Sequence, residues 1–283
     1  MFHQPRDLEK ALRLRADHPA ATVVNGATDI SVALNHGALH PQAFIDLSRI
    51  AVLRAVNREG DHYVMGAGAT FAQLGRCHLR ALREAALSVA GPAIRNMGTI
   101  GGNLVTASPA GDGCVALLAM GGDVELTSAA RGPRWVDIRS FFRGYRQTEL
   151  AADELVTRVR VPYNPATRWY KIGKRGAVNI SLVCCAVARR PDQTYGLAFG
   201  CVGPTPLFAP QAEALLGRAP LTPERIDAAA AQAETEVAPI DDHRGSAAYR
   251  RAMCRTLAHR LLTDLAASDG KGDADAASAG AAA

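Results

Sequence analysis

Two short segments carry the residue types that bind a phosphorylated ligand. The first is VVNGATDI, residues 23–30, and the second is GTIGGNLVTASPAGD, residues 98–112. Glycine tolerates positive φ and lets the backbone approach a ligand without a Cβ in the way. Consecutive free N–H groups in such turns form a concave anion site. We therefore expect two loops able to hold a phosphate or a pyrophosphate.

Both segments also contain short polar side chains. Hydrogen bonds to phosphate oxygens or sugar hydroxyls are within the capacity of Thr28, Thr99, Asn103, Thr106 and Ser108. Each segment also contains an acid near its end, Asp29 in the first and Asp112 in the second. Because a carboxylate repels a bare phosphate, the expected partners of these acids are ribose or ribityl hydroxyls, or backbone N–H groups.

Other nucleotide-binding motifs are missing from the sequence. There is no GxxxxGK[ST] motif, and no GxGxxG follows an expected strand. A P-loop or a Rossmann site is therefore disfavoured. Either glycine segment alone is equally consistent with an ordinary tight turn, but the two segments together favour a cofactor site.

Composition limits the class of protein. The chain has 283 residues, of which 48 % are hydrophobic, enough for a substantial core. A net charge of +5 and 5 % aromatic residues, without a basic run, argue against nucleic-acid binding. No signal peptide and no 18-residue apolar run is recognisable, so we expect a cytoplasmic protein without a membrane span.

The six cysteines show no spacing typical of a metal or iron–sulfur site. They are Cys77, Cys114, Cys184, Cys185, Cys201 and Cys254, and no CxxC pair occurs. We expect them to be buried small apolar residues or free thiols, with no metal bound by this chain.

Hydrophobic periodicity and turn residues predict a mixture of helices and strands. Helices are expected at residues 7–17, 71–89, 114–120, 209–217, 222–238 and 246–267. A strand that leads into the first glycine loop is expected within residues 21–30. Further strands are expected at residues 42–47, 62–70, 123–126 and 154–162, and in a meander formed by residues 168–175, 180–188 and 195–203. The tail, 268–283, is rich in Ala, Gly and Asp and is expected to be disordered.

The pair VVNGATDI and AGPAIRNMGTIGGNLVTASPAGD resembles the FAD-binding (medium) subunits of the molybdenum hydroxylases, the xanthine dehydrogenase family, which includes carbon monoxide dehydrogenase medium subunits. TIGGN followed by SPxxD is the most specific part of this resemblance. Further similarity occurs in FFRGYRQTELAADELVTRVRVP, KIGKRGAVNISLVCCAVA and HRGSAAYRRAMCRTLAHRLL, so the resemblance extends to about residue 265.

The resemblance implies an α+β fold. It consists of a vanillyl-alcohol-oxidase-type (PCMH-type) FAD-binding domain of two α/β subdomains, followed by a C-terminal α+β domain with an antiparallel sheet and helices. We expect the first subdomain at residues 1–55, the second at 56–163, the C-terminal domain at 168–267 and the disordered tail at 268–283.

The resemblance also implies a set of FAD-binding residues. The pyrophosphate would be held by Val24, Asn25, Gly26, Ala27, Thr28 and Asp29, with Ile30 alongside. The pyrophosphate, ribityl and flavin region would be lined by Ala90, Thr99, Gly102, Asn103, Thr106 and Asp112. The pocket would be completed by Leu155 or Val156 and by Lys171. No catalytic acid or base is implied.

Two positions depart from the family pattern. Where relatives usually have two glycines in the first loop, this chain has Asn25 and Gly26 followed by Ala27. Asparagine tolerates positive φ better than most residues, so we expect the turn to be retained. Where relatives commonly have an acid, Asn179 is neutral, which bears on an interface or on flavin tuning.

The resemblance implies an FAD-dependent oxidoreductase subunit. A large partner would hold the molybdenum cofactor, a small partner would hold two [2Fe–2S] clusters, and this chain would pass electrons to NAD+ or another acceptor, in a dimer of heterotrimers. A flavin-free scaffold subunit and a self-contained flavin oxidase are the alternatives. No acid/base constellation supports the oxidase.

The segment 139–175 is basic, with nine Lys and Arg residues against three acids. Such a segment forms either a solvated face or a field that attracts an anionic acceptor or an acidic partner.

Overall fold

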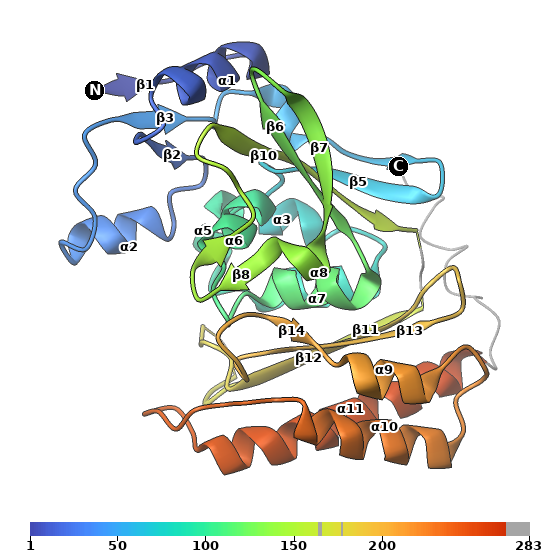
Figure 1. The fold of residues 1–283 in the computed structure, drawn as a ribbon. Coiled ribbons are helices and arrows are strands. Elements are labelled where there is room, and N and C mark those ends of the chain that lie inside the picture. Colours follow the sequence, from blue (N-terminus) through green and yellow to red (C-terminus); the bar gives the residue numbers. More distant parts are fainter. Residues whose placement is uncertain (164–165, 177, 270–283) are drawn as a thin grey trace.

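The structure is a computed structural model that describes residues 1–163, 166–176 and 178–269. The N-terminal part contains two sheets with helices packed beside them, and the C-terminal part is a sheet covered by helices (Figure 1). The predicted disordered tail lies outside the described residues, except for its first two residues, which end the last helix.

The first sheet is parallel, with the strand order β1-β3-β2. Its strands and the two helices that belong to it are β1 (Phe2–His3), α1 (Leu8–Asp17), β2 (Thr22–Val24), α2 (Ile30–Asn35) and β3 (Phe44–Asp46). The Asp7 side chain caps α1 by accepting a hydrogen bond from the Lys10 backbone N–H at 2.7 Å. Because the strands are parallel, the chain leaves all three at the same edge of the sheet, and the first glycine loop follows β2 there.

The second sheet is antiparallel, with the order β4-β5-β10-β6-β7. Its strands are β4 (Val56–Glu59), β5 (His62–Gly66), β6 (Asp123–Ser128), β7 (Gly132–Asp137) and β10 (Glu154–Pro162). The central strand β10 was predicted, and a register shift interrupts its pairing with β6 between Val156 and Arg158. Its residue Leu155 is buried in the core beneath the first sheet, so β10 links the two sheets.

The region predicted as a helix at 71–89 and a loop at 98–112, together with the separately predicted helix at 114–120, contains five helices. They are α3 (Phe71–Leu74), α4 (Arg80–Ser88), α5 (Pro92–Met97), α6 (Ile100–Thr106) and α7 (Asp112–Met120). The prediction of a loop over residues 98–112 is wrong for most of its length. Thr99 starts α6 by accepting a hydrogen bond from the Gly102 backbone N–H at 3.1 Å, and Gly101 lets this helix pack directly on Ala67.

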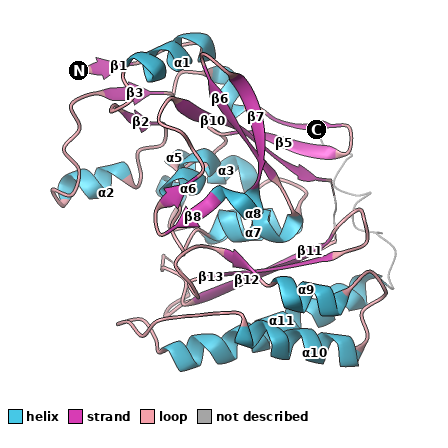
Figure 2. Ribbon diagram, viewed as in Figure 1, coloured by secondary structure: helices cyan, strands magenta, loops and turns pink. Residues whose placement is uncertain are grey.

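The C-terminal part contains the predicted antiparallel meander and three helices. Its elements are β11 (Thr167–Ile172), β12 (Val183–Arg189), β13 (Tyr195–Gly200), β14 (Leu207–Phe208), α9 (Pro210–Leu216), α10 (Pro223–Thr235) and α11 (Ala247–Asp269). Figure 2 shows α9, α10 and α11 on one side of this sheet, while α7 lies on the other side. The remaining elements are η1 (Ala51–Arg54), α8 (Ile138–Phe141) and the hairpin β8 (Phe142–Gly144) and β9 (Gln147–Thr148).

All six cysteines are buried and none forms a disulfide, as the sequence predicted. Burial raises the pKa of Cys77 to about 11 and the pKa of Cys201 to about 12, so these thiols stay protonated at neutral pH. No group of three His, Cys, Asp or Glu side chains suited to a metal occurs within the described residues. Within the same residues, no helix has the length and apolar character needed to cross a membrane.

The basic segment 139–175 is paired with acids from elsewhere in the chain. Arg139 contacts Glu213 at 2.6 Å, and Arg160 contacts Asp123 at 2.8 Å. Much of the charge excess in this segment is therefore neutralised by residues that are distant in sequence.

Gly101 provides a test of this packing. A Cβ there would lie 2.7 Å from both the Cβ and the carbonyl oxygen of Ala67. We expect Gly101→Ala to lower the free energy of unfolding by about 1–3 kcal/mol, because α6 would have to move away from Ala67, the residue that follows β5. Urea denaturation of the purified chain measures this change.

Gly102→Ala is the matched control. A Cβ there meets only the Thr99 hydroxyl oxygen within 4 Å, at 3.1 Å. Alanine is favoured over glycine inside a helix by about 0.5–1 kcal/mol, so this variant should unfold no more easily than the wild type. Equal destabilisation of both variants would contradict the packing role of Gly101.

Candidate functional site

A groove of about 650 Å³ lies between the first loop and the α5–α6 segment. One wall is the loop of residues 25–30, which follows β2, and the facing wall is formed by residues from Gly98 to Ser108. The start of β10 and the tip of the β8–β9 hairpin complete the lining. Both glycine segments thus line one groove, although 68 residues separate Asp29 of the first segment from Gly98 of the second.

The first loop has the backbone arrangement of an anion site. Within the described part of the chain, the N–H groups of residues 25–29 donate no hydrogen bond. The loop turns through Ala27, whose φ is +58°. Consecutive free N–H groups around such a turn form a concave site for a phosphate oxygen.

Gly26 fixes the distance between the two walls. A Cβ at this position would lie 1.9 Å from the carbonyl oxygen of Met97. Real side chains cannot approach a backbone oxygen so closely, so only glycine lets the first loop contact the end of α5. This contact places the loop beside Gly98 and the start of α6.

The left-handed residue of the first loop is Ala27, whereas the sequence suggested Asn25. Asn25 is not among the residues with positive φ. Ala90 and Ala107, with φ of +40° and +46°, also adopt this conformation close to the groove. A left-handed alanine costs of the order of 1–3 kcal/mol, and such strain tends to concentrate at functional sites.

The second wall differs from the first because the N–H groups of the first three residues of α6 are already used. Ile100 donates to the Ala69 carbonyl, Gly101 donates to the Ala67 carbonyl, and Gly102 donates to the Thr99 hydroxyl. Gly102 is exposed and its missing Cβ leaves backbone open to the groove. The second wall therefore shapes the groove, and the first loop supplies backbone donors.

Most of the residues implied by the resemblance line this groove. They are Asn25, Gly26, Ala27, Thr28, Asp29, Ile30, Thr99, Gly102, Asn103, Thr106, Leu155 and Val156. Val24 is the last residue of β2 and is not part of the lining. Ala90 and Lys171 line a neighbouring hollow between α4 and β11.

Asp112 is buried behind the groove wall and is paired with Lys171. The Lys171 ammonium donates to Asp112 Oδ2 at 2.7 Å, and the Ser181 hydroxyl donates to Asp112 Oδ1 at 2.7 Å. The Asp112 and Lys171 side chains are 6 % and 10 % exposed. This ion pair connects the start of α7 to β11 and so joins the two parts of the chain.

Sequence reasoning missed several groove residues, among them two arginines. Arg15 comes from α1, and Arg146 comes from the tip of the β8–β9 hairpin. The Arg146 guanidinium lies 3.5 Å from Asp29 Oδ2 in the first loop. Arg146 belongs to FFRGYRQTEL, a segment of the family resemblance, which was the available signal.

Glu154 is a third groove residue that the sequence did not single out. It is 2 % exposed, and Arg134 Nε donates to its Oε1 at 2.7 Å. This hydrogen bond lowers the pKa of Glu154 below its ordinary value, so the carboxylate stays ionised at the groove.

The groove fits an elongated cofactor with a pyrophosphate. The free N–H groups of the first loop and the cations of Arg15 and Arg146 suit an anionic centre, and the open backbone at Gly102 allows close approach. Leu155 and Val156 at the start of β10 make the adjoining part of the lining apolar, although both side chains are largely buried. These features define a protein that binds a dinucleotide cofactor between α/β layers.

Comparisons with known proteins identify the cofactor class. Residues 1–164 match the family described as the FAD binding domain in molybdopterin dehydrogenase. Residues 168–265 match the CO dehydrogenase flavoprotein C-terminal domain. The chain belongs to the family of FAD-binding subunits of the molybdenum hydroxylases.

Similar proteins match this chain over almost their whole length. The nicotinate dehydrogenase FAD-subunit of Eubacterium barkeri is 34 % identical, with 93 % of this chain and 95 % of that protein covered. The putative xanthine dehydrogenase FAD-binding subunit of Escherichia coli K12 is 31 % identical, with 95 % and 97 % covered.

A solved structure of carbon monoxide dehydrogenase from Hydrogenophaga pseudoflava contains a chain with the same fold. The TM-score is 0.85 at 31 % identity, and 93 % of this chain and 95 % of that chain are covered. The predicted family, the α+β fold with an FAD-binding domain and a C-terminal domain, and the FAD cofactor are therefore confirmed. The subdomain boundaries and the role of each groove residue stay predictions.

The buried pair of Asp112 and Lys171 can be tested by unfolding. Asp112→Asn leaves the Lys171 ammonium buried without its counter-charge, so we expect a loss of about 3–5 kcal/mol in the free energy of unfolding. The double variant Asp112→Asn with Lys171→Met removes both charges and should recover most of this loss. Urea denaturation measures both variants.

Arg13→Gln provides the control for this experiment, because Arg13 forms an exposed ion pair with Glu9 on α1. Its effect should stay below about 1 kcal/mol. A similarly small effect of Asp112→Asn would show that this ion pair does not hold the two parts of the chain together.

Proposed function

We propose that this chain is the electron-transfer subunit of a molybdenum-containing hydroxylase complex in the cytoplasm. It receives electrons from [2Fe–2S] clusters on a small partner and delivers them to NAD+ or another acceptor. A large partner holds the molybdenum cofactor, and the complex is a dimer of heterotrimers. The observation that carries this proposal is the groove, whose free N–H groups suit a pyrophosphate, in a chain of this family.

The names of similar proteins support a role as one subunit among several. Relatives include the carbon monoxide dehydrogenase medium chain of Afipia carboxidovorans, which is 31 % identical over 92 % of this chain. The word "medium" in its name fits a complex that also has larger and smaller chains. In this chain the thiols are buried and protonated, which suits a subunit that receives electrons from clusters held by a partner.

Bound FAD supplies redox chemistry that links one-electron donors to a hydride acceptor such as NAD+. The chain's own residues bind and orient this cofactor. The N–H groups of residues 25–29 would hold the pyrophosphate, and the Arg15 guanidinium, together with Arg146 beside Asp29, would face its charge. Leu155 and Val156 would limit the access of water to the part of the cofactor beside β10.

The polar side chains of the groove are available for the remaining parts of the cofactor. The Thr28 and Thr106 hydroxyls line the groove and make no hydrogen bond to the described part of the chain. They are suited to donate to phosphate oxygens or to a ribityl chain. The Asp112–Lys171 pair supports the wall from behind, so its role toward the cofactor is to position α7.

The electron-transfer proposal is tested first on the full chain expressed alone. Acid release from the yellow protein should give about one FAD per chain, and NADH should then bleach the flavin absorbance if NAD+ is the acceptor. Bleaching only by a quinol would indicate a quinone acceptor. The second step is co-expression with a molybdenum-cofactor subunit and a [2Fe–2S] subunit, followed by size measurement of the complex.

Two outcomes would overturn the proposal. A folded, colourless chain that cannot be reconstituted with FAD would favour the flavin-free scaffold subunit. Reduction of the flavin by an organic substrate without any partner would favour the self-contained oxidase.

Gly102→Val tests where the cofactor lies. Its branched side chain would project into the open part of the groove, so we expect FAD content to fall by about tenfold or more while the fold is retained. The release of FAD on denaturation measures the content, and circular dichroism checks the fold.

Gly91→Val is the matched control for this placement. A Cβ at Gly91 would meet no atom within 4 Å, whereas one at Gly102 meets only the Thr99 hydroxyl oxygen, and Gly91 is not part of the groove lining. This control should keep FAD at the wild-type level. Wild-type FAD content in Gly102→Val would contradict the placement of the cofactor against α6.

A further inference from the structure

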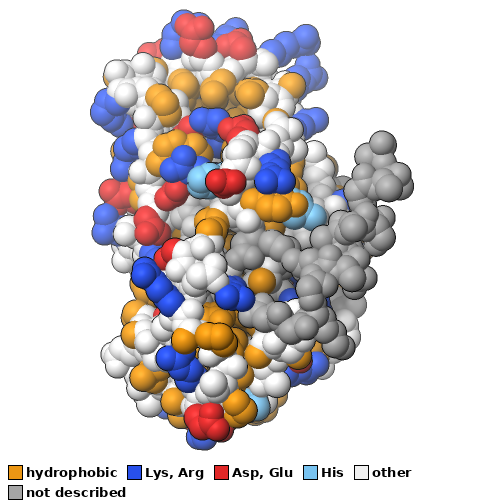
Figure 3. All heavy atoms as spheres, turned by 90° about the vertical axis from the view of Figure 1, so that its right-hand side faces the viewer, with side chains coloured by type: hydrophobic (Ala, Val, Ile, Leu, Met, Phe, Trp, Pro, Cys, Tyr) orange, Lys and Arg blue, Asp and Glu red, His pale blue; other side chains and the backbone are white. Residues whose placement is uncertain are grey.

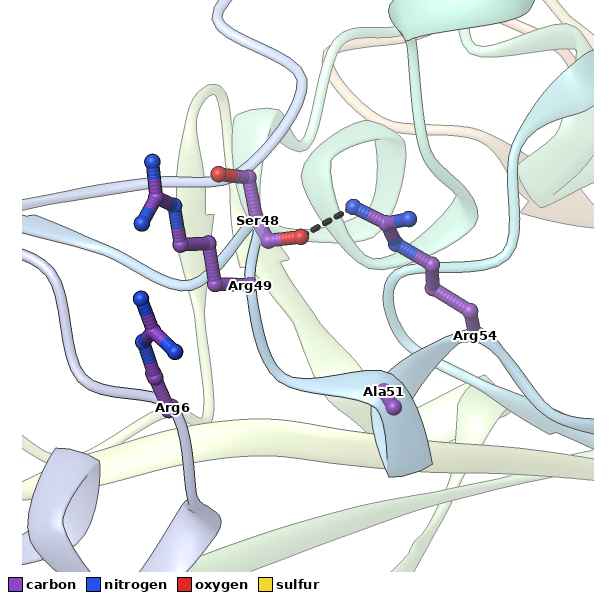
Figure 4. Close-up of a pocket in the computed structure, with 5 residues that line it drawn as sticks. All are labelled: Arg6, Ser48, Arg49, Ala51 and Arg54. Atoms are coloured by element: carbon purple, nitrogen blue, oxygen red, sulfur yellow. Dashed lines mark hydrogen bonds between the residues drawn. The ribbon is translucent and has the colours of Figure 1, made fainter.

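A hollow of about 460 Å³, called the second hollow below, lies at the edge of the first sheet where its strands end. It is lined by Arg6, Ser48, Arg49, Ala51 and Arg54, and it shares no residue with the lining of the FAD groove. In Figure 4, Arg6 and Arg49 extend in the same direction on one side of Ser48. Arg54 reaches Ser48 from the other side and donates to its carbonyl oxygen.

The topology of the first sheet brings these residues together. Arg6 follows β1, Ser48 and Arg49 follow β3, and Arg54 ends the short helix η1 that comes next. Strands β1 and β3 are parallel neighbours, so their carboxyl ends meet at one edge of the sheet. Ligands in sheets of this kind commonly bind outside the carboxyl ends of the strands.

Asp46 fixes the two strand exits relative to each other. Its Oδ2 accepts a hydrogen bond from Gln4 Nε2 at 2.6 Å, and its Oδ1 accepts one from the Ser48 backbone N–H at 2.9 Å. Asp46 is 9 % exposed, so this carboxylate is largely buried. Its two oxygens accept hydrogen bonds from the segments that follow β1 and β3. The positions of Arg6 and Arg49 on either exit are therefore set by a buried network.

The positive charge of this hollow is not balanced by an acid of the chain. Within residues 1–163, 166–176 and 178–269, no ion pair involves Arg6, Arg49 or Arg54. The acid next to Arg6 in sequence, Asp7, caps α1 through the Lys10 backbone N–H. Three guanidinium groups around one concavity repel each other in the absence of an anion, and an anion would remove this repulsion.

We propose that this hollow is a binding site for the phosphate groups of a small ligand, separate from the FAD groove. Guanidinium groups bind phosphate oxygens through paired N–H donors with a geometry that fits a tetrahedral anion. Three of them, with the Ser48 hydroxyl between, match the charge of a pyrophosphate group. That group reaches the site either as free pyrophosphate or as part of a nucleoside diphosphate.

The test is a calorimetric titration of the full, FAD-loaded chain with inorganic pyrophosphate and, separately, with ADP, at constant ionic strength. The bound FAD keeps the probe out of the groove, so heat reports on the second hollow. We expect saturable binding that weakens by about tenfold or more in the triple variant Arg6→Gln, Arg49→Gln, Arg54→Gln. Tighter binding of ADP than of pyrophosphate would identify a nucleotide as the source of the phosphate groups, and equal binding would identify free pyrophosphate.

The matched control removes three positive charges elsewhere, with the variant Lys10→Gln, Arg76→Gln, Arg218→Gln. These residues are exposed and line neither of the two cavities. The control should bind pyrophosphate within about twofold of the wild type, because distant surface charges are screened. Both variants should keep the wild-type FAD content and thermal midpoint.

Three results would overturn the proposal. They are an equal loss of binding in both triple variants, no saturable binding of either probe to the wild type, and binding of a poly-glutamate peptide where neither probe binds. The last result would indicate that the hollow contacts an acidic protein surface. FAD content is measured in the same samples, so failure of this site is distinguished from failure of the electron-transfer proposal.

Discussion

The contact between Gly26 and the Met97 carbonyl is the constraint on which the groove depends. A Cβ at Gly26 would lie 1.9 Å from that oxygen, so the two backbones meet only because no side chain stands between them. This contact holds the first loop against the end of α5, where its residues, with their N–H groups free, line the groove opposite α6. The glycine is therefore required for the distance between two walls rather than for its own φ, since Gly26 does not have a positive φ.

The two walls then divide the work of binding. The first loop offers backbone donors that no other group in the described chain uses, whereas the donors of α6 are used to hold that helix on Ala67, Ala69 and Thr99. An anionic group of a ligand would therefore bind at the first loop. The exposed backbone at Gly102 leaves room for the ligand on the opposite wall. The Asp112–Lys171 ion pair connects α7, which follows this wall in the chain, to β11 of the C-terminal sheet.

Sequence patterns predicted the elements whose signals are local. The strand predicted at 154–162 corresponds to β10, the apolar strand predicted at 180–188 to β12, and the helix predicted at 222–238 to α10. Helix α6 was missed because the two glycines in IGGNLVT disfavour a helix, and this helix depends on the contact of Gly101 with Ala67. Helix α5, with the sequence PAIRNM, was missed because six residues are too few to show a hydrophobic period. Family resemblance supplied most groove residues, but Arg146 reaches Asp29 across 117 residues, which no local pattern predicts.

The sequence also does not show which basic residues are paired with acids in the fold. The segment 139–175 has the most conspicuous excess of basic residues in the sequence, yet Arg139, Arg158 and Arg160 are paired with acids that lie far away in the chain. The arginines of the second hollow, in contrast, have no acidic partner within the described residues, and two of them, Arg6 and Arg49, are brought to one edge by parallel strands. Where this protein attracts an anion is therefore decided by which acids the fold brings to each arginine, because a charge within about 4 Å outweighs the average charge of a segment.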